Sequence, residues 1–317
     1  MFTIACPQQT CHITAKSDKI NRMTWQINDN DKQLIEIALA EDLSDNTEIS
    51  KAYRDITSDY LFADHSKTQK ASIISKHYDD FVFCGRAVIE AILSRLSDNY
   101  VLDYVVEDGA IVSPGASVAI IESDSKTLVI AERTILNFLQ HLCGIATLTR
   151  QFVDKIADTS TKILDTRKTL PGFRHLDKYA VHCGGGVNHR MGLYDAIMIK
   201  DNHIDALGGV AQAMAKLPDD ILNHYPVIVE VRDSEQLAQL IHVGSHKVSR
   251  VLLDNMSTRK LAAGVKLCKN VFPTEASGGI NLENIAAIAA TGVDYASVGS
   301  ITHSAASIDL SMSVDIS

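Results

Sequence analysis

Apolar runs that end in polar or glycine residues recur through the second half of the chain. They occupy residues 162–165, 196–200, 227–231, 251–255, 274–279 and 295–300. Near-continuous apolar composition is typical of short strands that are covered on both faces. Residues 234–241 and 282–290 between them have the apolar spacing of crossover helices. This alternation of strand and helix predicts a parallel sheet.

The polar strand ends predict how that sheet is arranged. A charged or glycine-rich group follows or closes each successive run, as in a (β/α) barrel, where the active site collects at the carboxyl ends of the strands. Each group could instead be an ordinary residue that terminates a strand. Six such groups in series, with complementary chemistry, favour the barrel.

The first half of the chain is organised differently. Residues 70–76, 80–85 and 117–121 are expected to form strands, and residues 88–93 a helix. Turns are predicted at Gly109, Pro114 and Gly115. This order indicates an α+β domain, and a long amphipathic run at 128–140 leads from it toward the barrel.

Composition narrows the class of protein. The chain has 317 residues, enough for a barrel and a smaller domain, and its formal net charge of −9 argues against nucleic acid as a partner. Any attraction for anions must therefore be local. No run approaches a membrane span, and the N-terminus lacks the apolar core of a signal peptide, so we expect a cytoplasmic protein. Residues 1–25 are polar and aperiodic, which predicts a loosely ordered extension.

The six cysteines are scattered along the sequence. Cys6 and Cys11 lie close together, but no second pair completes a zinc-binding pattern; the others are Cys84, Cys143, Cys183 and Cys268. The simplest interpretation is free thiols in a reducing compartment.

Cations and histidines gather between residues 165 and 203. The segments Asp165-Thr166-Arg167-Lys168-Thr169, Asn188-His189-Arg190 and Lys200-Asp201-Asn202-His203 are flanked by apolar runs. Such a composition is suited to binding a small polyanion.

Here the sequence resembles a known family. Five segments resemble motifs of quinolinate phosphoribosyltransferase, the carboxylating nicotinate-nucleotide pyrophosphorylase of NAD synthesis. They are residues 164–174 (LDTRKTLPGFR), 178–181 (KYAV), 184–190 (GGGVNHR), 252–255 (LLDN) and 275–280 (EASGGI). The resemblance runs from about Ile35 to the C-terminus. It implies that quinolinate is joined to phosphoribosyl pyrophosphate with Mg²⁺, giving nicotinate mononucleotide, pyrophosphate and carbon dioxide.

The resemblance also implies the domain arrangement. Family members have an N-terminal α+β open-faced sandwich and a TIM-like, incomplete parallel α/β barrel with fewer than eight strands. We therefore expect the sandwich at residues 26–143, completed by 301–317, and the barrel at 144–300. The family further implies a homodimer, with a hexamer of such dimers left open.

Quinolinate carries two carboxylates beside a ring nitrogen, so its recognition needs forked cationic donors. The residues that the resemblance assigns to quinolinate are Arg133, Thr166, Arg167, Lys168, His189 and Arg190, with Arg133 contributed by the neighbouring subunit. A Glu-Arg pair on a helix is more often a solvated face, which is the alternative for Arg133. For Arg167 and Lys168 the alternative is a structural ion pair with Asp165.

The resemblance assigns a second set to phosphoribosyl pyrophosphate. It comprises Lys200, Glu230, Asp254, Ser277, Gly278, Gly279, Val298, Gly299, Ser300 and His303. Glu230 and Asp254 would also hold Mg²⁺, partly through water, and Lys168, Lys200, Glu230 and Asp254 form the implied catalytic set. The two glycine loops each lie between a predicted strand and helix, where backbone N–H groups can approach a phosphate.

Alternatives to this assignment remain at single residues. Glu230 or Asp254 could cap the following helix, and Lys200 could form a Schiff base, as in a barrel aldolase. A non-catalytic metabolite-binding relative is a third interpretation. Two features depart from the family: the glycine-rich approach to Asp55-Ile56-Thr57 is missing at residues 48–54, and Asp201 stands where glutamate is common.

Overall fold

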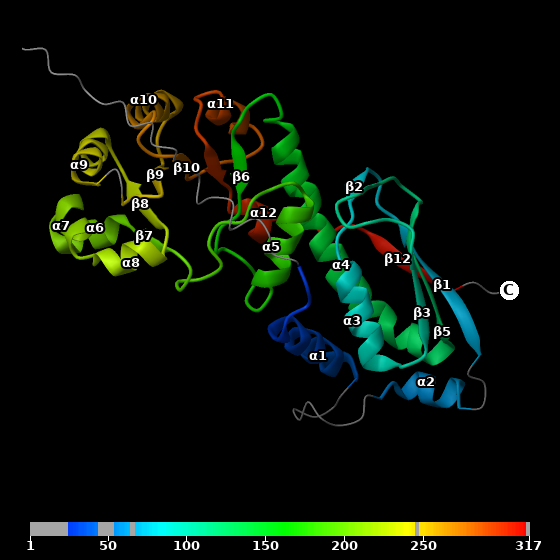
Figure 1. The fold of residues 1–317 in the computed structure, drawn as a ribbon. Helices are drawn as coiled ribbons and strands as arrows, with labels where there is room; N and C mark the ends of the chain where they lie inside the picture. Colours follow the sequence, from blue (N-terminus) through cyan, green and yellow to red (C-terminus); the bar gives the residue numbers. More distant parts are fainter. Residues whose placement is uncertain (1–24, 44–53, 64–66, 245–246, 315–317) are drawn as a thin grey trace, which may run out of the picture.

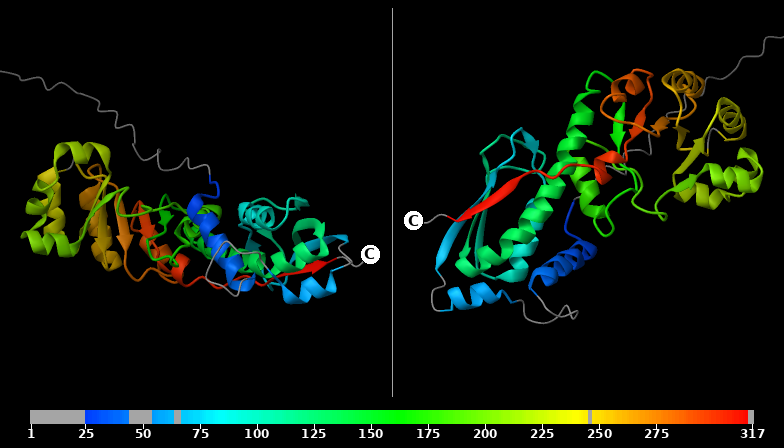
Figure 2. Two further views of the ribbon diagram at one scale, coloured as in Figure 1. Left: turned by 90° about the horizontal axis from the view of Figure 1, so that it is seen from below. Right: turned by 180° about the vertical axis from the view of Figure 1, so that it is seen from behind.

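The computed structural model describes residues 25–43, 54–63, 67–244 and 247–314. Most of the predicted N-terminal extension, Cys6, Cys11 and the unusual stretch before Arg54 lie outside the described residues. The molecule is elongated, with an α+β domain at one end and the parallel sheet at the other, and helix α1 lies between them (Figures 1 and 2).

The first domain is a sheet covered by helices. Its strands are β1 (Thr68–Ser75), β2 (Phe81–Val82), β3 (Tyr100–Tyr104), β4 (Ile111–Val112) and β5 (Ser117–Asp124). Its helices are α1 (Asp29–Leu43), α2 (Ile56–Leu61), α3 (Arg86–Leu96) and α4 (Ser125–Asp154). The main sheet is antiparallel in the order β12-β1-β5-β3, where β12 is Leu310–Val314 from the end of the chain, and β2 pairs with β4.

Alternation of side chains explains the sandwich. Ala71 and Ile73 of β1 are buried opposite Ile121 and Ala119 of β5, whereas the intervening Ser72 is partly exposed. The buried face packs against the apolar faces of α3 and α4. Strands of this kind stabilise a sheet that is covered on one side, which is the open-faced arrangement that the sequence predicted.

The second domain is the parallel sheet. Its strands are β6 (Lys162–Leu164), β7 (Ile197–Ile199), β8 (Val227–Val231), β9 (Arg250–Asp254), β10 (Thr274–Ser277) and β11 (Tyr295–Ser297). Its helices are α5 (Arg174–Cys183), α6 (Asp201–Leu207), α7 (Val210–Ala215), α8 (Asp219–His224), α9 (Ser234–Gly244), α10 (Thr258–Cys268), α11 (Ile285–Ala289) and α12 (Ser300–His303).

The strand order confirms an incomplete α/β barrel. The strands pair in the order β6-β11-β10-β9-β8-β7, so from β7 to β11 each strand neighbours the next along the chain, and β11 pairs with β6. The pair that would close the barrel, β6 with β7, is missing from the described sheet. Val187 makes an isolated parallel bridge with Leu164 at the open edge of β6. The barrel is therefore open where the chain runs from β6 to β7.

Helix α4 connects the two domains without a break. The amphipathic run predicted at 128–140 continues to Asp154, so the boundary expected at 143/144 falls inside the helix. Gly144 lets the returning chain pass close to this helix, because a methyl group there would lie 2.2 Å from the carbonyl oxygen of Ala306. Beyond that contact the chain returns to the first domain, where β12 (Leu310–Val314) pairs antiparallel with β1.

Two further observations concern the cysteines and the helices. Cys84, Cys143, Cys183 and Cys268 are free thiols, as expected. In the described part of the chain, no helix combines the length and the apolar character needed to cross a membrane.

Candidate functional site

Parallel pairing brings the predicted site residues to one edge of the sheet. Asp254 is the last residue of β9 and is in register with Ser277, the last residue of β10. Lys200 follows β7 directly, and Glu230 is the penultimate residue of β8. The segments after β6 and β11 carry the remaining candidates. The polar groups that are separate in sequence thus share the carboxyl edge of the barrel.

The acidic side of this edge is formed by β7, β8 and β9. Lys200 Nζ lies 4.0 Å from Glu230 Oε2; the lysine side chain is 50% exposed and the glutamate 12%. Burial raises the pKa of Glu230, the charges of Asp254 and Asp201 add to this, and Lys200 opposes it. A bound cation would favour the charged form of Glu230, which burial and the neighbouring carboxylates disfavour.

Lys200 also begins helix α6. Its backbone N–H donates to His203 Nδ1 at 3.0 Å, which fixes the turn between β7 and the helix. Its side chain carries the ammonium group on a flexible stem toward Glu230.

Lys168 lies beside the last glycine loop. A methyl group at Gly299 would lie 3.1 Å from Lys168 Cδ and 3.3 Å from His303 Nε2. The hydroxyl of Thr302 donates to the carbonyl oxygen of Lys168 at 2.8 Å, and the Lys168 N–H donates to Thr166 Oγ1 at 3.0 Å. The loop after β6 is therefore tied to α12, and a lysine, a histidine and a glycine backbone are gathered at one point.

Arg174 holds the loop that carries Arg167. Its guanidinium donates to Thr169 Oγ1 at 3.2 Å, to the carbonyl oxygen of Met191 at 3.1 Å and to that of Arg167 at 3.4 Å. Sequence reasoning gave Arg174 no role. One signal was available, because a cation at the first position of a helix opposes the helix dipole and needs another reason to be there.

A buried ion pair lies beneath this loop. Asp165 and Lys178 are fully buried and paired with each other, so the predicted alternative, an ion pair between Asp165 and the cations after Thr166, is wrong. Asn188 Nδ2 donates to Asp165 at 2.6 Å and the His189 N–H at 2.8 Å. Burial raises the pKa of Asp165 and lowers that of Lys178, and their mutual attraction opposes both shifts.

His189 is buried, and within the described residues its ring is hydrogen-bonded at Nδ1 but not at Nε2. Its Nδ1 accepts the Arg190 N–H at 2.7 Å, and its Nε2 lies 3.5 Å from Glu275 Oε1. Glu275 is itself fully buried, with Arg250 Nε at 2.6 Å and the Ser297 hydroxyl as a donor. Burial alone raises the pKa of Glu275, but the Arg250 charge, His189 and Ser297 lower it overall.

Arg190 lies in the segment that joins β6 to β7, on the open side of the barrel. Its guanidinium donates to the carbonyl oxygen of Ala196 at 2.9 Å and contacts the sulfur of Met198 at 3.6 Å. Burial lowers the pKa of Arg190, and the positive charge of Arg167 lowers it further. The two arginines that the sequence placed together thus act on each other electrostatically.

The glycine loops differ from one another. Gly278 and Gly279 have φ of 95° and 62°, which side chains rarely adopt. The helix predicted at 282–290 begins later, at Ile285, and is α11 (Ile285–Ala289). Asn281 and Asn284 first form a hydrogen-bonded turn. By contrast, α12 begins within the Val298-Gly299-Ser300 loop.

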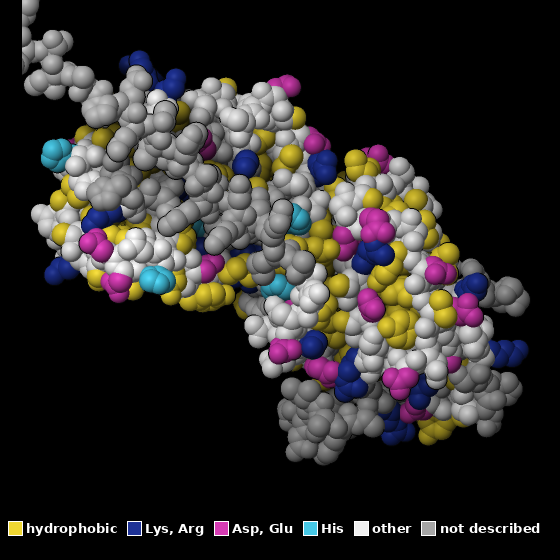
Figure 3. Space-filling view, in the orientation of Figure 1, with side chains coloured by type: hydrophobic (Ala, Val, Ile, Leu, Met, Phe, Trp, Pro, Cys, Tyr) yellow, Lys and Arg dark blue, Asp and Glu magenta, His cyan; other side chains and the backbone are white. Residues whose placement is uncertain are grey.

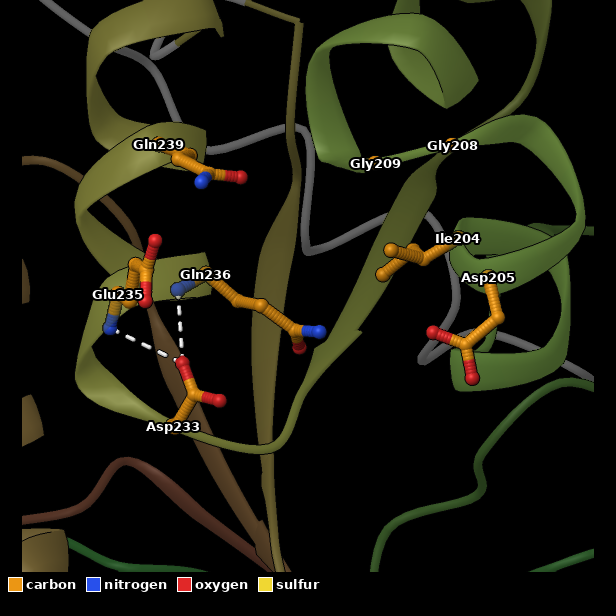
Figure 4. A pocket seen from close by; sticks show the side chains of 8 residues that line it. All are labelled: Ile204, Asp205, Gly208, Gly209, Asp233, Glu235, Gln236 and Gln239. Carbon is orange, nitrogen blue, oxygen red and sulfur yellow. Dashed lines mark hydrogen bonds between the residues drawn. The ribbon is translucent and has the colours of Figure 1, made fainter.

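A groove of about 420 Å³ lies on the flank of the barrel, between α9 and the segment that joins α6 to α7 (Figure 4). None of its lining residues is a predicted site residue. Asp233 is occupied in accepting the N–H groups of Glu235 and Gln236, and Asp205 pairs with Arg232 at 2.6 Å. The groove therefore offers no second catalytic set.

Charge elsewhere is dispersed. Figure 3 shows basic and acidic side chains mixed over the visible face of the sandwich domain. Arg133, on α4, is 59% exposed and lies 3.9 Å from Glu132 Oε1. Among the described residues, no group of three or more His, Cys, Asp or Glu is arranged to hold a metal ion.

Comparison with known proteins gives the family. The model of the quinolinate phosphoribosyl transferase N-terminal domain matches residues 55–143, and that of the C-terminal domain matches residues 145–313. A probable nicotinate-nucleotide pyrophosphorylase [carboxylating] from Bacillus subtilis is 41% identical over 263 residues, covering 83% of this chain and 89% of the relative. A quinolinate phosphoribosyltransferase [decarboxylating] from Nicotiana glauca is 37% identical over 303 residues, covering 90% and 82%.

Solved structures agree with this result. The nicotinate-nucleotide pyrophosphorylase from Francisella tularensis superposes with a TM-score of 0.82 at 37% identity, covering 92% of this chain and all of the other. Human nicotinic acid phosphoribosyltransferase shares the fold, with a TM-score of 0.53 at 10% identity. Together with the domain matches, these likenesses show that the chain belongs to the quinolinate phosphoribosyl transferase family.

Proposed function

We propose that the chain transfers the phosphoribosyl group of phosphoribosyl pyrophosphate to quinolinate with decarboxylation, giving nicotinate mononucleotide, pyrophosphate and carbon dioxide in NAD synthesis. Family membership supports this activity. The observation that carries it in this molecule is that a cationic set after β6 and two carboxylates at β8 and β9 lie at the same carboxyl edge of the parallel sheet.

Quinolinate binding is assigned to the cationic set. Arg167 and Arg190 supply two forks, with Lys168 and Thr166 on the same loop as Arg167. Paired guanidinium groups match a dicarboxylate, whose charge relieves the repulsion between them. His189 belongs to the same set: its Nδ1 accepts the Arg190 N–H, while its Nε2 makes no hydrogen bond within the described residues and is left for a ligand.

Phosphoribosyl pyrophosphate is assigned to the acidic side and the glycine loops. Glu230 and Asp254 fit Mg²⁺, which binds to few carboxylates and completes its shell with water and substrate oxygens. When bound, the ion would neutralise the pyrophosphate and improve it as a leaving group. Lys200 would meet the pyrophosphate, while Gly278, Gly279, Gly299 and His303 would receive the 5′-phosphate.

The chemistry requires positioning and charge rather than a general base. The ring nitrogen of quinolinate is unprotonated at neutral pH, so it can attack the anomeric carbon as pyrophosphate leaves. The nearby carboxylates of Glu230 and Asp254 stabilise the positive charge that develops on the ribose. The quaternised nitrogen then stabilises the carbanion left by loss of the adjacent carboxylate as carbon dioxide. The residues of the protein act by holding the two substrates in line.

We further propose that the active site is shared in a homodimer. The Arg133 side chain is largely exposed on α4, and the ion pair that it makes with Glu132 is long. Such a pair contributes little stability, which leaves the arginine available to a neighbouring subunit. The cytoplasm is the proposed location, supported by the free thiols of the described cysteines.

The aldolase alternative is weakened by the surroundings of Lys200. A Schiff-base lysine is usually desolvated or placed near another cation, whereas Lys200 is half exposed and lies beside Glu230. Treatment with borohydride and a carbonyl substrate should therefore leave the protein unmodified. A binding-only relative would not be expected to retain Lys168, Glu230 and Asp254 together.

The test of the proposal is pyrophosphate release with quinolinate and, separately, with nicotinate. We expect release with quinolinate, accompanied by one carbon dioxide per turnover. Release with nicotinate alone would contradict the proposal and favour a transferase that does not decarboxylate.

A further inference from the structure

One residue connects the acidic side of the barrel edge to its glycine loop. Asn255 follows β9 directly after Asp254, and its Nδ2 donates to Asp254 Oδ2 at 2.7 Å. The Asn255 backbone N–H donates to the carbonyl oxygen of Ser277 at 2.9 Å. The same residue therefore touches a carboxylate on one strand and the loop that follows the next.

The conformation of Asn255 favours this double contact. Its φ is 51°, in the left-handed region that asparagine tolerates better than most side chains. A methyl group at Gly278 would lie 2.2 Å from Asn255 Oδ1, so the side chain fits closely over a residue with no Cβ. The amide is thus set between Asp254 and the glycine loop.

We infer that Asn255 is a positioning residue for phosphoribosyl pyrophosphate. By binding Asp254 Oδ2 it fixes the rotation of that carboxylate and leaves Oδ1 for a ligand. By packing over Gly278 and donating to the Ser277 carbonyl oxygen, it fixes the position of the glycine loop relative to the Asp254 carboxylate. The two ends of one substrate are then held at a constant separation.

This inference rests on the proposed function for the identity of the ligand. Asn255 is hydrogen-bonded to Asp254 and Ser277, neither of which belongs to the quinolinate residues after β6 or around Arg190. Loss of the Asn255 amide should consequently affect one substrate and spare the other. A merely structural role would weaken both substrates, or neither.

The experiment measures binding of phosphoribosyl pyrophosphate with Mg²⁺, and of quinolinate, by calorimetry. Asn255→Gly keeps the positive φ and removes the amide, so affinity for phosphoribosyl pyrophosphate should fall about 10–100-fold, as is typical for residues that orient a ligand group. Affinity for quinolinate should change less than about twofold, because sites that share no partners act nearly independently.

Two more variants separate the causes. Asn255→Asp has the same shape but cannot donate to Asp254, so it should lose at least as much affinity as Asn255→Gly. Asn270, an exposed residue with φ of 65° before β10 at the opposite edge of the sheet, is the matched control. Asn270→Gly should leave the binding of both substrates unchanged.

The inference is overturned if Asn255→Gly and Asn255→Asp bind phosphoribosyl pyrophosphate within twofold of the unaltered protein, or if quinolinate is weakened equally. Turnover with quinolinate is measured separately on the unaltered protein. A protein that binds phosphoribosyl pyrophosphate through Asn255 but shows no turnover would contradict the proposed function and support the positioning role.

Discussion

The polar groups beneath β6 and those at the ends of β7, β8 and β9 differ in how completely the protein satisfies them. Asp165 and Lys178 are fully buried and paired, and Asp165 receives two more hydrogen bonds. Lys200 and Glu230 are 4.0 Å apart, and the pKa of Glu230 is raised by burial and by Asp254. The first set completes the fold, whereas the second retains unused capacity to bind charge.

This difference in how far the two sets of charges are satisfied indicates which set binds ligands. A buried pair with all its partners gains nothing from a substrate and would lose stability if it were disturbed. Carboxylates that repel each other at the edge of a barrel gain from a bound cation. The two sets should therefore respond oppositely to mutation, one in stability and the other in activity.

The largest effect should come from the satisfied pair. Lys178→Met leaves the Asp165 carboxylate buried without its cation, which typically destabilises a protein by about 3–5 kcal/mol. Urea unfolding measures the change, with the exposed Lys162→Met as the control, expected within about 0.5 kcal/mol of the unaltered protein. Equal stability of both variants would show that the pair does not stabilise the fold.

The unsatisfied set should affect catalysis instead. Glu230→Ala and Asp254→Ala should each lower kcat by about 10²–10³-fold, because the charge that develops on the ribose loses its stabilising carboxylate. Quinolinate binding, measured by calorimetry, should remain largely intact. Glu235→Ala, an exposed carboxylate on the neighbouring α9, is the control. Undiminished turnover in either site variant would refute the metal and ribose assignment.

The arginines should set the preference for a dicarboxylate. Nicotinate lacks the carboxylate beside the nitrogen and loses one charge-assisted pair with Arg167, which is exposed, or Arg190, which is partly buried. Such a pair is worth about 1.5–3 kcal/mol, or a preference of at least about tenfold. Arg167→Ala or Arg190→Ala should weaken quinolinate strongly and nicotinate much less. Competition binding of both acids measures the gap. An equal loss of affinity for the two acids would contradict the assignment of the arginines to the dicarboxylate.

The smallest expected signal tests sharing between subunits. Arg133→Ala and Lys168→Ala proteins should each be inactive alone, yet an equal mixture should recover about a quarter of the activity, since half the dimers would carry one complete site. The measurement is turnover after subunit exchange, which a tagged copy verifies. No recovery despite confirmed exchange would mean that Arg133 acts within its own chain or not at all.

Much of the barrel could be predicted from local pattern. The run predicted at 227–231 coincides with β8, and that predicted at 251–255 is displaced by one residue from β9. Buried strands need apolar residues on both faces, so their extent is visible in the sequence. The carboxyl-edge location of Glu230 and Asp254 followed from the same pattern, since parallel strands share one edge.

Other features could not be predicted locally. The run at 128–140 belongs to a helix that extends to Asp154, and the distant residue Ala306 packs against it at Gly144. Lys178 as the partner of Asp165 was not predicted, since the cations after Thr166 are nearer in sequence but Lys178 is the one brought beneath the loop. Arg174 acquired its role only when three separate carbonyl and hydroxyl groups converged on it.

The sequence by itself determined the strands, their parallel order and the chemical types gathered at their ends, because burial and periodicity act over short stretches of chain. The tertiary structure decided where the barrel opens, which charges are satisfied and how Asn255 joins Asp254 to Gly278. Those outcomes depend on distances of a few ångströms between residues far apart in the chain, and hydrogen bonds and ion pairs form only at such distances.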